Sequence, residues 1–285
     1  MIDLHTHSRC SDGTDPPERV VELAAAAGCS AVALTDHDTI AGVPAATTAA
    51  RRLGIRLVPG CEVSCAAPTG SAHVLCYFLD DPRSPLADEL ARLRQDRTER
   101  NAALFARLAE LDLPATEAEV RAEAGSEGIG RPHVAAVLVR NGAAATIDEA
   151  FDRYLGKGAP AYVPKARVTV EEVARLAAAS KAVAVLAHPL SLGLSDAALE
   201  ATVAELAAGG LGGLECHYGR YDPPTRSALA ELAGRHRLVA TGGSDFHGAY
   251  KADLAVGVGT GDLRVPDAAL DALDARRDLL AGRAR

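Results

Sequence analysis

The sequence predicts an α/β protein whose seven strands form a closed or nearly closed barrel, interrupted once by a helical insertion. Short apolar runs alternate with helix-length segments over most of the chain, which indicates a largely parallel sheet. Side chains that bind metal follow several of these apolar runs. The alternation stops between residues 85 and 160, where helical patterns follow one another without a convincing strand.

The first part of the barrel is predicted from four apolar runs and the two helical segments between the first three of them. Pro16 and Pro17 suit a helix start, and Gly28 suits the end of the same helix. The expected strands lie within residues 2–5, 31–38, 55–65 and 71–78, and the expected helices within 16–28 and 42–54.

The alternation resumes after the insertion with three further strands and three helices. The expected helices lie within residues 168–182, 196–210 and 223–236, and the expected strands within 183–189, 211–218 and 237–247. We therefore expect two domains: a metal-binding barrel formed by residues 1–84 and 161–285, and a helical substrate-recognition domain formed by residues 85–160.

Composition limits the classes of protein that the chain can represent. A chain of 285 residues with 48% hydrophobic residues can bury one sizeable core. Its net charge of −8 argues against a protein that coats duplex DNA by counterion release. There is neither a signal-peptide pattern nor an apolar run long enough to cross a membrane. The six cysteines form no C-x-x-C pair, so we expect reduced thiols and a cytoplasmic location.

Nine side chains with nitrogen or oxygen ligand atoms fall at or near the ends of the expected strands. His5 and His7 are two residues apart, so both rings can leave the first strand on the same side. A histidine at a strand end is more often a hydrogen-bonded boundary residue than a ligand, but the carboxyl ends of barrel strands open onto one mouth. The nine residues are His5, His7, Asp12, His37, Glu62, His73, His188, Asp245 and His247.

This set predicts bound metal. Three carboxylates gathered at one mouth would repel one another and lose solvation unless cations lay between them. Nine ligands exceed the needs of one tetrahedral ion and suit two or three divalent ions, with Mn, Fe and Zn as candidates and Mg as a further option. Asp36 and Asp38 flank His37, and either of two roles is open to them: orienting imidazoles or shaping the turn.

Six short motifs, taken together and in order, resemble the polymerase-and-histidinol-phosphatase (PHP) family of phosphoesterases. They are HTH at 5–7, SDG at 11–13, TDHD at 35–38, PGCE at 59–62, AHP at 187–189 and SDFH at 244–247. The resemblance implies a distorted seven-stranded barrel. Family members commonly have a histidine where Asp12 stands, so the second of the implied metal sites departs from the family pattern.

The resemblance also implies which residues share an ion. One ion would be held by His5, His7, Glu62 and Asp245, a second by Asp12, His37 and His247, and a third by His73 and His188 with Glu62 as a bridge. Clustered divalent ions neutralise a phosphate ester and acidify water, so we expect hydrolysis of phosphomonoesters. The residues expected to serve this reaction most directly are Asp12, His37, Asp245 and His247.

The insertion is expected to select the substrate. Arg131 and His133 in GRPH stand at an expected helix start, where backbone N–H groups favour an anion. GRPH after a helical insertion resembles the subgroup that hydrolyses nucleoside 3′,5′-bisphosphates and the 5′ ends of short RNA. Lys165 and His217 are further candidates for phosphate contact, although either could equally be a plain surface or strand-end residue.

Several alternatives stay open at this point. A histidinol-phosphate phosphatase or a general nucleotide or sugar phosphatase would share the barrel and the metals. A metal-dependent amidohydrolase also begins with His-x-His, but it typically bridges its metals with a modified lysine, whereas the third strand here ends in Glu62. A non-catalytic binding module would be expected to lack ligands. A proofreading module of a polymerase is not expected, because no polymerase domain follows.

Overall fold

The computed structural model of the chain describes residues 1–67, 70–124, 129–164 and 168–282. Its contacts divide the chain into two compact units, residues 1–90 with 167–285 and residues 91–166. The first unit contains the sheet, and the second is the helical insertion. The boundary falls within the long helix α3 (Pro85–Glu110).

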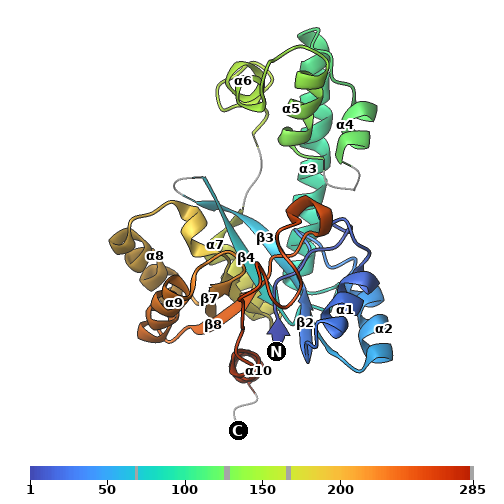
Figure 1. Cartoon of the computed structure of the whole chain (residues 1–285). Helices are drawn as coiled ribbons and strands as arrows, with labels where there is room; N and C mark the ends of the chain where they lie inside the picture. The colour runs from blue at the N-terminus through green and yellow to red at the C-terminus, as the bar shows by residue number, and fades with distance from the viewer. Residues whose placement is uncertain (68–69, 125–128, 165–167, 283–285) are drawn as a thin grey trace. The chain divides into compact units, whose positions relative to one another are not determined.

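The first unit is built around one sheet that curves into a nearly closed barrel (Figure 1). Seven strands follow one another around it in the order β1, β2, β3, β4, β6, β7 and β8, and the short β5 pairs with β3 beside this path. The strands are β1 (Ile2–Asp3), β2 (Ala31–Leu34), β3 (Arg56–Ala67), β4 (Gly70–Tyr77), β5 (Val168–Thr169), β6 (Val183–Leu186), β7 (Gly213–Tyr218) and β8 (Val239–Gly243).

Strand β4 runs antiparallel to both of its neighbours, β3 and β6, whereas the other neighbouring pairs are parallel. The reason is the short connection between β3 and β4. Strand β3 ends at residue 67 and β4 begins at residue 70, whereas a connection between two parallel strands needs a dozen or more residues. The start of β4 therefore lies at the same end of the barrel as the carboxyl ends of β3 and β6.

The barrel closes where β1 meets β8. The Leu4 amide donates to the Gly242 carbonyl at 3.1 Å, and the Asp245 amide donates to the His5 carbonyl at 2.8 Å. A Cβ atom at Gly243 would lie 2.3 Å from the His5 nitrogen, so only glycine allows this approach. The buried Asp3 carboxylate strengthens the junction by accepting hydrogen bonds from the amides of Ser244 and Gly257.

Helices cover the outside of the barrel, as the alternating pattern predicts. Along β2, Ala31 and Ala33 face the interior core, while Val32 and Leu34 pack outward with residues of α1 and α2. Figure 1 shows α1 and α2 together beside β2 on the right, and α8 and α9 on the opposite, left-hand side of the barrel. The five helices are α1 (Pro17–Ala26), α2 (Val43–Leu53), α7 (Val170–Ala179), α8 (Asp196–Ala208) and α9 (Pro223–Arg235).

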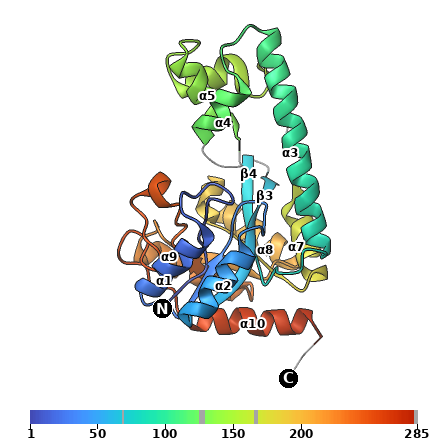
Figure 2. The ribbon, with the colours of Figure 1, turned by 90° about the vertical axis from the view of Figure 1, so that its right-hand side faces the viewer.

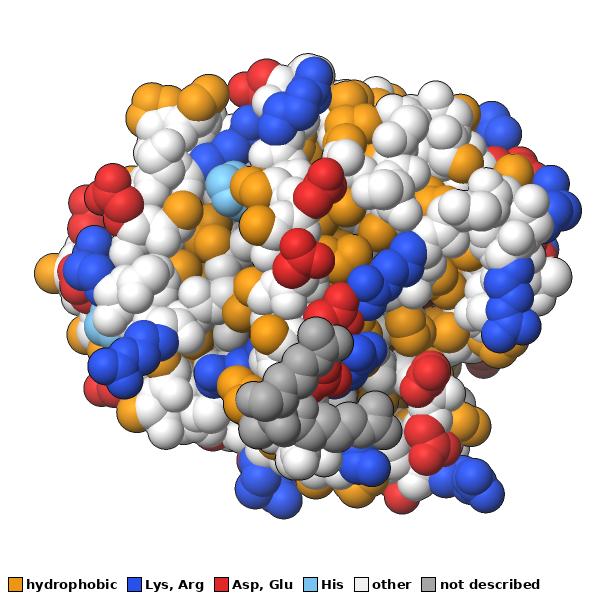
Figure 3. All heavy atoms as spheres, turned by 90° about the horizontal axis from the view of Figure 1, so that it is seen from below, with side chains coloured by type: hydrophobic (Ala, Val, Ile, Leu, Met, Phe, Trp, Pro, Cys, Tyr) orange, Lys and Arg blue, Asp and Glu red, His pale blue; other side chains and the backbone are white. Residues whose placement is uncertain are grey.

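A C-terminal helix, α10 (Ala268–Leu280), closes the end of the barrel opposite the mouth (Figures 1 and 2). Its Leu270 and Leu273 belong to the same apolar core as Ile2 and Val183. The sequence analysis did not anticipate this helix. On the described part of this face, acidic and basic side chains are interspersed with hydrophobic ones (Figure 3). Among the described helices of the chain, none has the length and apolarity needed to cross a bilayer.

The second unit has an apolar core of its own. Leu104 and Leu108 from α3 pack with Val120, Val134 and Leu138. Figure 2 shows α4 and α5 beside the corresponding part of α3. Between residues 91 and 164 the described segments are helices and turns, as expected, and include no strand. Besides α3, the elements are α4 (Glu117–Ala124), α5 (Arg131–Arg140), α6 (Ile147–Ala150) and a π-helical turn, η1 (Phe151–Leu155).

Candidate metal centre

The nine residues singled out from the sequence come together at one mouth of the barrel. Most follow the carboxyl ends of parallel strands. His73 reaches the same mouth for a different reason: it lies near the start of the antiparallel β4 and pairs in register with Ser64, two residues beyond Glu62. Three overlapping groups of these side chains have ligand atoms within 4.8 Å of one another.

The first group is the most deeply buried. The Nε2 atoms of His5 and His7 are 3.0 Å apart. Glu62 Oε2 lies 3.2 Å from the His5 nitrogen and 3.1 Å from the His7 nitrogen. Asp245 Oδ1 is 3.4 Å from each of them. Four ligand atoms on three different loops or strands therefore face one small volume.

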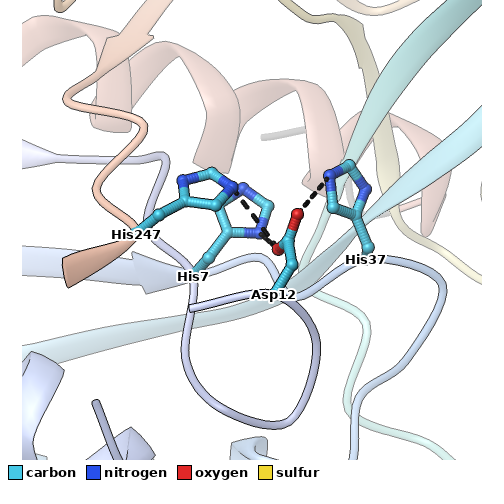
Figure 4. A group of neighbouring side chains, drawn as sticks. All are labelled: His7, Asp12, His37 and His247. Atoms are coloured by element: carbon cyan, nitrogen blue, oxygen red, sulfur yellow. Dashed lines mark ion pairs between the residues drawn. The ribbon is translucent and has the colours of Figure 1, made fainter. Parts of the chain in front are cut away.

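The second group is centred on Asp12, which lies between His247 and His37 in Figure 4. Asp12 Oδ1 is 3.4 Å from His247 Nε2, and Oδ2 is 3.6 Å from His37 Nε2. His7 Nδ1 also lies 3.4 Å from Oδ1, so His7 contacts carboxylates through both ring nitrogens. A Cβ atom at Gly13 would lie 2.6 Å from the His7 carbonyl oxygen, so glycine permits the tight turn that brings Asp12 back.

The third group consists of His37, Glu62 and His73, and His188 lies beside it on the same oxygen of Glu62 as His73. Glu62 Oε1 is 3.0 Å from His73 Nδ1 and 2.9 Å from His188 Nε2. His37 Nε2 lies 3.3 Å from Glu62 Oε2 and so connects this group to the second. The single carboxylate of Glu62 thus contacts imidazoles on both of its oxygens, which is the arrangement that a bridging ligand requires.

These donors fit divalent cations. The hydrogen bond from His247 Nδ1 to the Asp245 carbonyl, at 2.8 Å, leaves Nε2 of that ring without a proton when the imidazole is neutral. In the described part of the chain, the buried Nδ1 atom of His37 has no hydrogen-bond partner, while Nε2 of the same ring faces the carboxylates of Asp12 and Glu62. Imidazole and carboxylate ligand atoms that face one another in this way indicate a site suited to cations.

Burial and neighbouring charges shift the protonation of the cluster strongly. Burial opposes charge on Glu62, but the imidazoles of His37 and His5 outweigh it and hold its pKa well below the usual range. Burial also opposes charge on His5, yet the carboxylates of Glu215 and Glu62 raise its pKa to about 10. For His37, burial dominates and lowers the pKa to about 4. Neighbouring imidazoles therefore carry different charges near neutral pH.

Two candidate ligands lie on backbone that side chains rarely adopt. Asp245 has a φ angle of 56° and His188 one of 27°, both in the left-handed region. Such residues cost about 1–3 kcal/mol each and persist only where the surrounding structure holds them. The mouth of the barrel therefore contains strained backbone at two of the candidate metal ligands.

Glu215 is a site residue that the sequence analysis missed. It lies on β7, is fully buried, and accepts a hydrogen bond from His5 Nδ1 at 2.8 Å through Oε1. Its Oε2 accepts from the backbone amide of His188 at 2.6 Å. A carboxylate behind an imidazole fixes the tautomer that presents Nε2 to a metal. The signal in the sequence was a glutamate inside the apolar run 211–218.

Asp36 and Asp38 hold backbone and loop groups. Asp36 is buried and accepts hydrogen bonds from the Ser8 amide at 2.7 Å, the Ser8 hydroxyl at 2.8 Å and the Ser11 hydroxyl at 2.7 Å. Asp38 accepts from the Ser64 amide at 2.8 Å. Of the two roles left open by the sequence, these contacts favour the structural one.

The substrate-binding candidates are not all in one place. Arg131 and His133 open α5 in the helical unit, where the Gly130 amide donates to His133 Nδ1 at 3.1 Å. His217 lies on β7 outside the metal groups, and burial together with the charge of Arg226 lowers its pKa. Lys165 lies outside the described residues.

Arg131 belongs to a concentration of positive charge inside the helical unit. Its guanidinium donates to the Leu155 carbonyl at 3.1 Å and lies 5.3 Å from the centroid of the Tyr162 ring. Burial, followed by the charges of Arg131 and Arg97, lowers the pKa of Arg100 to about 10. The buried Nε of Arg100 lacks a hydrogen-bond partner among the described residues.

The barrel, its carboxylate and imidazole cluster, and the chain's relatives define a metal-dependent phosphoesterase. The family model described as the PHP domain matches residues 3–117. The 5′-3′ exoribonuclease Rnm of Salmonella typhimurium is 36% identical over 87% of this chain and 85% of its own. The chain belongs to the PHP domain family, as its motifs predict.

Two further comparisons agree. The 3′,5′-nucleoside bisphosphate phosphatase of Chromobacterium violaceum is 34% identical over 86% of this chain and 87% of its own. A solved structure from Bifidobacterium adolescentis, assigned as a metal-dependent phosphoesterase, is 33% identical with a TM-score of 0.77 and covers 96% of both chains. The similarity therefore extends through both the barrel and the insertion.

Proposed function

We propose that this protein hydrolyses phosphomonoesters of nucleotides, with nucleoside 3′,5′-bisphosphates as the preferred substrates and release of the 3′-phosphate. The 5′ ends of short RNA are the second substrate class. The observation that carries the proposal is Glu62, whose two oxygens contact five imidazoles of the cluster. The names of the relatives, a bisphosphate phosphatase and an exoribonuclease, support the choice of nucleotides.

The candidate ligands would hold up to three divalent ions. His5, His7, Glu62 and Asp245 would hold one ion, Asp12, His37 and His247 a second, and His73 and His188 a third. Bound divalent ions act as Lewis acids on phosphoryl oxygens and make water a stronger nucleophile near neutral pH. Asp12 is the most exposed of the three carboxylates, at 48% of its side chain, so a water or substrate that enters the mouth can reach it.

Arg131 supplies recognition of a second phosphate in this proposal. A planar guanidinium binds phosphate through two parallel hydrogen bonds, and N–H groups at the first turn of α5 favour an anion as well. The charges of Arg131 and Arg97 add to burial in lowering the pKa of Arg100, and a bound phosphate would offset that repulsion. The acidic chain as a whole offers no general attraction for phosphate, so a local basic cluster is informative.

Phosphate release from purified protein tests the function. The assay compares nucleoside 3′,5′-bisphosphates, nucleoside monophosphates, 5′-phosphorylated short RNA and histidinol phosphate, each with Mn, Mg and Zn. We expect the highest kcat/KM with a bisphosphate. His7→Ala and Asp245→Ala should each abolish turnover with an unchanged circular dichroism spectrum, whereas His236→Ala, outside the metal groups, should retain it. Turnover by the His7 variant would exclude the proposed chemistry, and a preference for histidinol phosphate would replace the proposed substrate.

A further inference from the structure

Lys251 is a positively charged side chain in direct contact with the candidate metal centre. Its Nζ lies 2.5 Å from Asp245 Oδ2. Among the ion pairs of the described residues, this is the one that joins a lysine or arginine to a carboxylate of the three metal groups. The sequence analysis did not single out this residue.

The two oxygens of Asp245 face different surroundings. Oδ1 faces the imidazoles of His5, His7 and His247. Oδ2 accepts a hydrogen bond from the Tyr218 hydroxyl at 2.8 Å and pairs with Lys251. Because Oδ1 alone is turned to the candidate ligands, a cation bound there would leave the contact between Oδ2 and Lys251 in place.

The turn that carries Lys251 is fixed to the loop that carries Asp12. Lys251 ends a short 3-10 turn, η3 (Gly248–Lys251). The Ala249 amide in this turn donates to the Thr14 hydroxyl at 3.0 Å, and the Thr14 amide donates to the His247 carbonyl at 3.2 Å. Lys251 is therefore held at the rim of the cluster by contacts within the barrel unit.

Lys251 has hydrogen-bond donors available for a ligand, whereas the single donor of Tyr218 is already used. An ammonium group has three N–H donors, and in the described structure one of them has a partner, Asp245. The Tyr218 hydroxyl has a single hydrogen and gives it to the same carboxylate oxygen. The Lys251 side chain is 28% exposed, whereas that of Asp245 is 4% exposed, so the ammonium can meet a ligand that enters the mouth.

We propose that Lys251 is a substrate-binding residue that donates hydrogen bonds to the phosphoryl group being hydrolysed, while Tyr218 positions Asp245. This inference rests on the proposed function. A compact ammonium on a flexible stem suits a phosphoryl group, whose non-bridging oxygens are negatively charged and accept hydrogen bonds. The role differs from that of Arg131, because Lys251 belongs to the barrel and contacts the phosphate that every substrate possesses.

Binding of inorganic phosphate to the manganese-loaded protein, measured by titration calorimetry, tests this role without turnover. Lys251→Gln should weaken phosphate binding about ten- to hundredfold, because a hydrogen bond to a charged group is lost. Its bound manganese, measured by elemental analysis, should stay at the wild-type amount. Lys181→Gln, which changes an exposed lysine at the end of α7, is the matched control and should bind phosphate like the wild type.

Kinetics with a nucleoside monophosphate and a 3′,5′-bisphosphate complete the test. Lys251→Gln should lower kcat/KM for both substrates by the same factor, and Lys251→Arg should restore part of the loss. If Lys251→Gln instead lost manganese in parallel with phosphate affinity, Lys251 would only hold Asp245 and the proposal would be wrong. Wild-type phosphate affinity in Lys251→Gln would also overturn it. Failure of the wild type to hydrolyse any nucleotide would count against the proposed function instead.

Discussion

The Oε1 atom of Glu215 lies 2.8 Å from Nδ1 of His5, and both side chains are fully buried. The same carboxylate holds the backbone of His188 through its second oxygen, at 2.6 Å. One glutamate on β7 therefore contacts two candidate ligands at once, the ring of His5 and the backbone of His188. His188 has a strained backbone, and the contact with Glu215 helps to hold it.

Glu215→Gln should weaken metal binding about ten- to hundredfold, which is the usual effect of removing the carboxylate behind a ligand histidine. A glutamine can still contact both groups, but it is neutral, and its amide nitrogen cannot accept a hydrogen bond. Elemental analysis after dialysis against a weak chelator measures the loss. Glu231→Gln on the exposed side of α9 is the control. Full metal content in Glu215→Gln would show that Glu215 does not support the centre.

Metal binding should depend on pH through His5. Carboxylates raise the pKa of His5 to about 10 in the metal-free protein, whereas its ordinary value is 6.5. The protonated ring therefore stabilises the metal-free fold below about pH 6.5, and this contribution is lost as the pH rises through 10. A metal needs the neutral ring, so binding displaces a proton and strengthens by about tenfold per pH unit for each proton displaced.

Calorimetric titration of manganese into metal-free protein between pH 6.5 and 8.5 measures this dependence. Repeating it in buffers with different ionisation enthalpies counts the protons released. The Glu215→Gln variant should release fewer protons on binding manganese, because Glu215 contributes most among the carboxylates that raise the pKa of His5. An affinity that does not change with pH, with no proton release, would contradict the assigned charge of His5.

The clustering of the candidate metal ligands could be predicted from the sequence because each follows or ends a recognisable apolar run. His73 was placed correctly at the mouth although its strand runs the other way, and the short connection between residues 67 and 70 held the information needed. Glu215 and Lys251 could not be found in this way. Glu215 contacts His5, which is 210 positions away in the chain, because the sheet closes. Lys251 contacts Asp245, 6 positions away, because a 3-10 turn brings it back. Neither residue belongs to a motif.

Helix α10 was missed for a physical reason as well. Its core residues Ala269, Leu270 and Leu273 form only a short apolar stripe, and charged residues at 276–278 separate this stripe from the last leucines of the helix. Its burial depends on an open barrel end, which no local pattern shows. His217, a candidate for phosphate contact, lies outside the metal groups, and an irregularity between residues 215 and 217 changes the register of β7 against β8 at this point.

Thr169→Ala should lower the stability of the barrel unit by about 0.5–2 kcal/mol. The Thr169 hydroxyl accepts a hydrogen bond from the Glu172 amide at 3.2 Å, and the Glu172 carboxylate accepts one from the Thr169 amide at 3.1 Å. The two hydrogen bonds form a reciprocal cap at the N-terminus of α7. Urea unfolding followed by circular dichroism measures the change. Thr48→Ala, whose hydroxyl donates to a carbonyl within α2, should change the midpoint little. Equal effects of the two substitutions would show that this cap contributes nothing of its own.

Arg131→Ala should separate recognition from chemistry. If the barrel residues perform hydrolysis and Arg131 binds a second phosphate, the substitution should raise KM for a 3′,5′-bisphosphate much more than KM for a simple phosphomonoester. Losing a charge-assisted contact is worth roughly 1.5–3 kcal/mol, which corresponds to about a ten- to hundredfold loss of kcat/KM for the bisphosphate. Arg140→Ala, at the other end of α5, is the control and should alter neither KM. An equal loss for both substrates, or no loss for either, would remove Arg131 from substrate recognition and favour a general or histidinol-phosphate phosphatase.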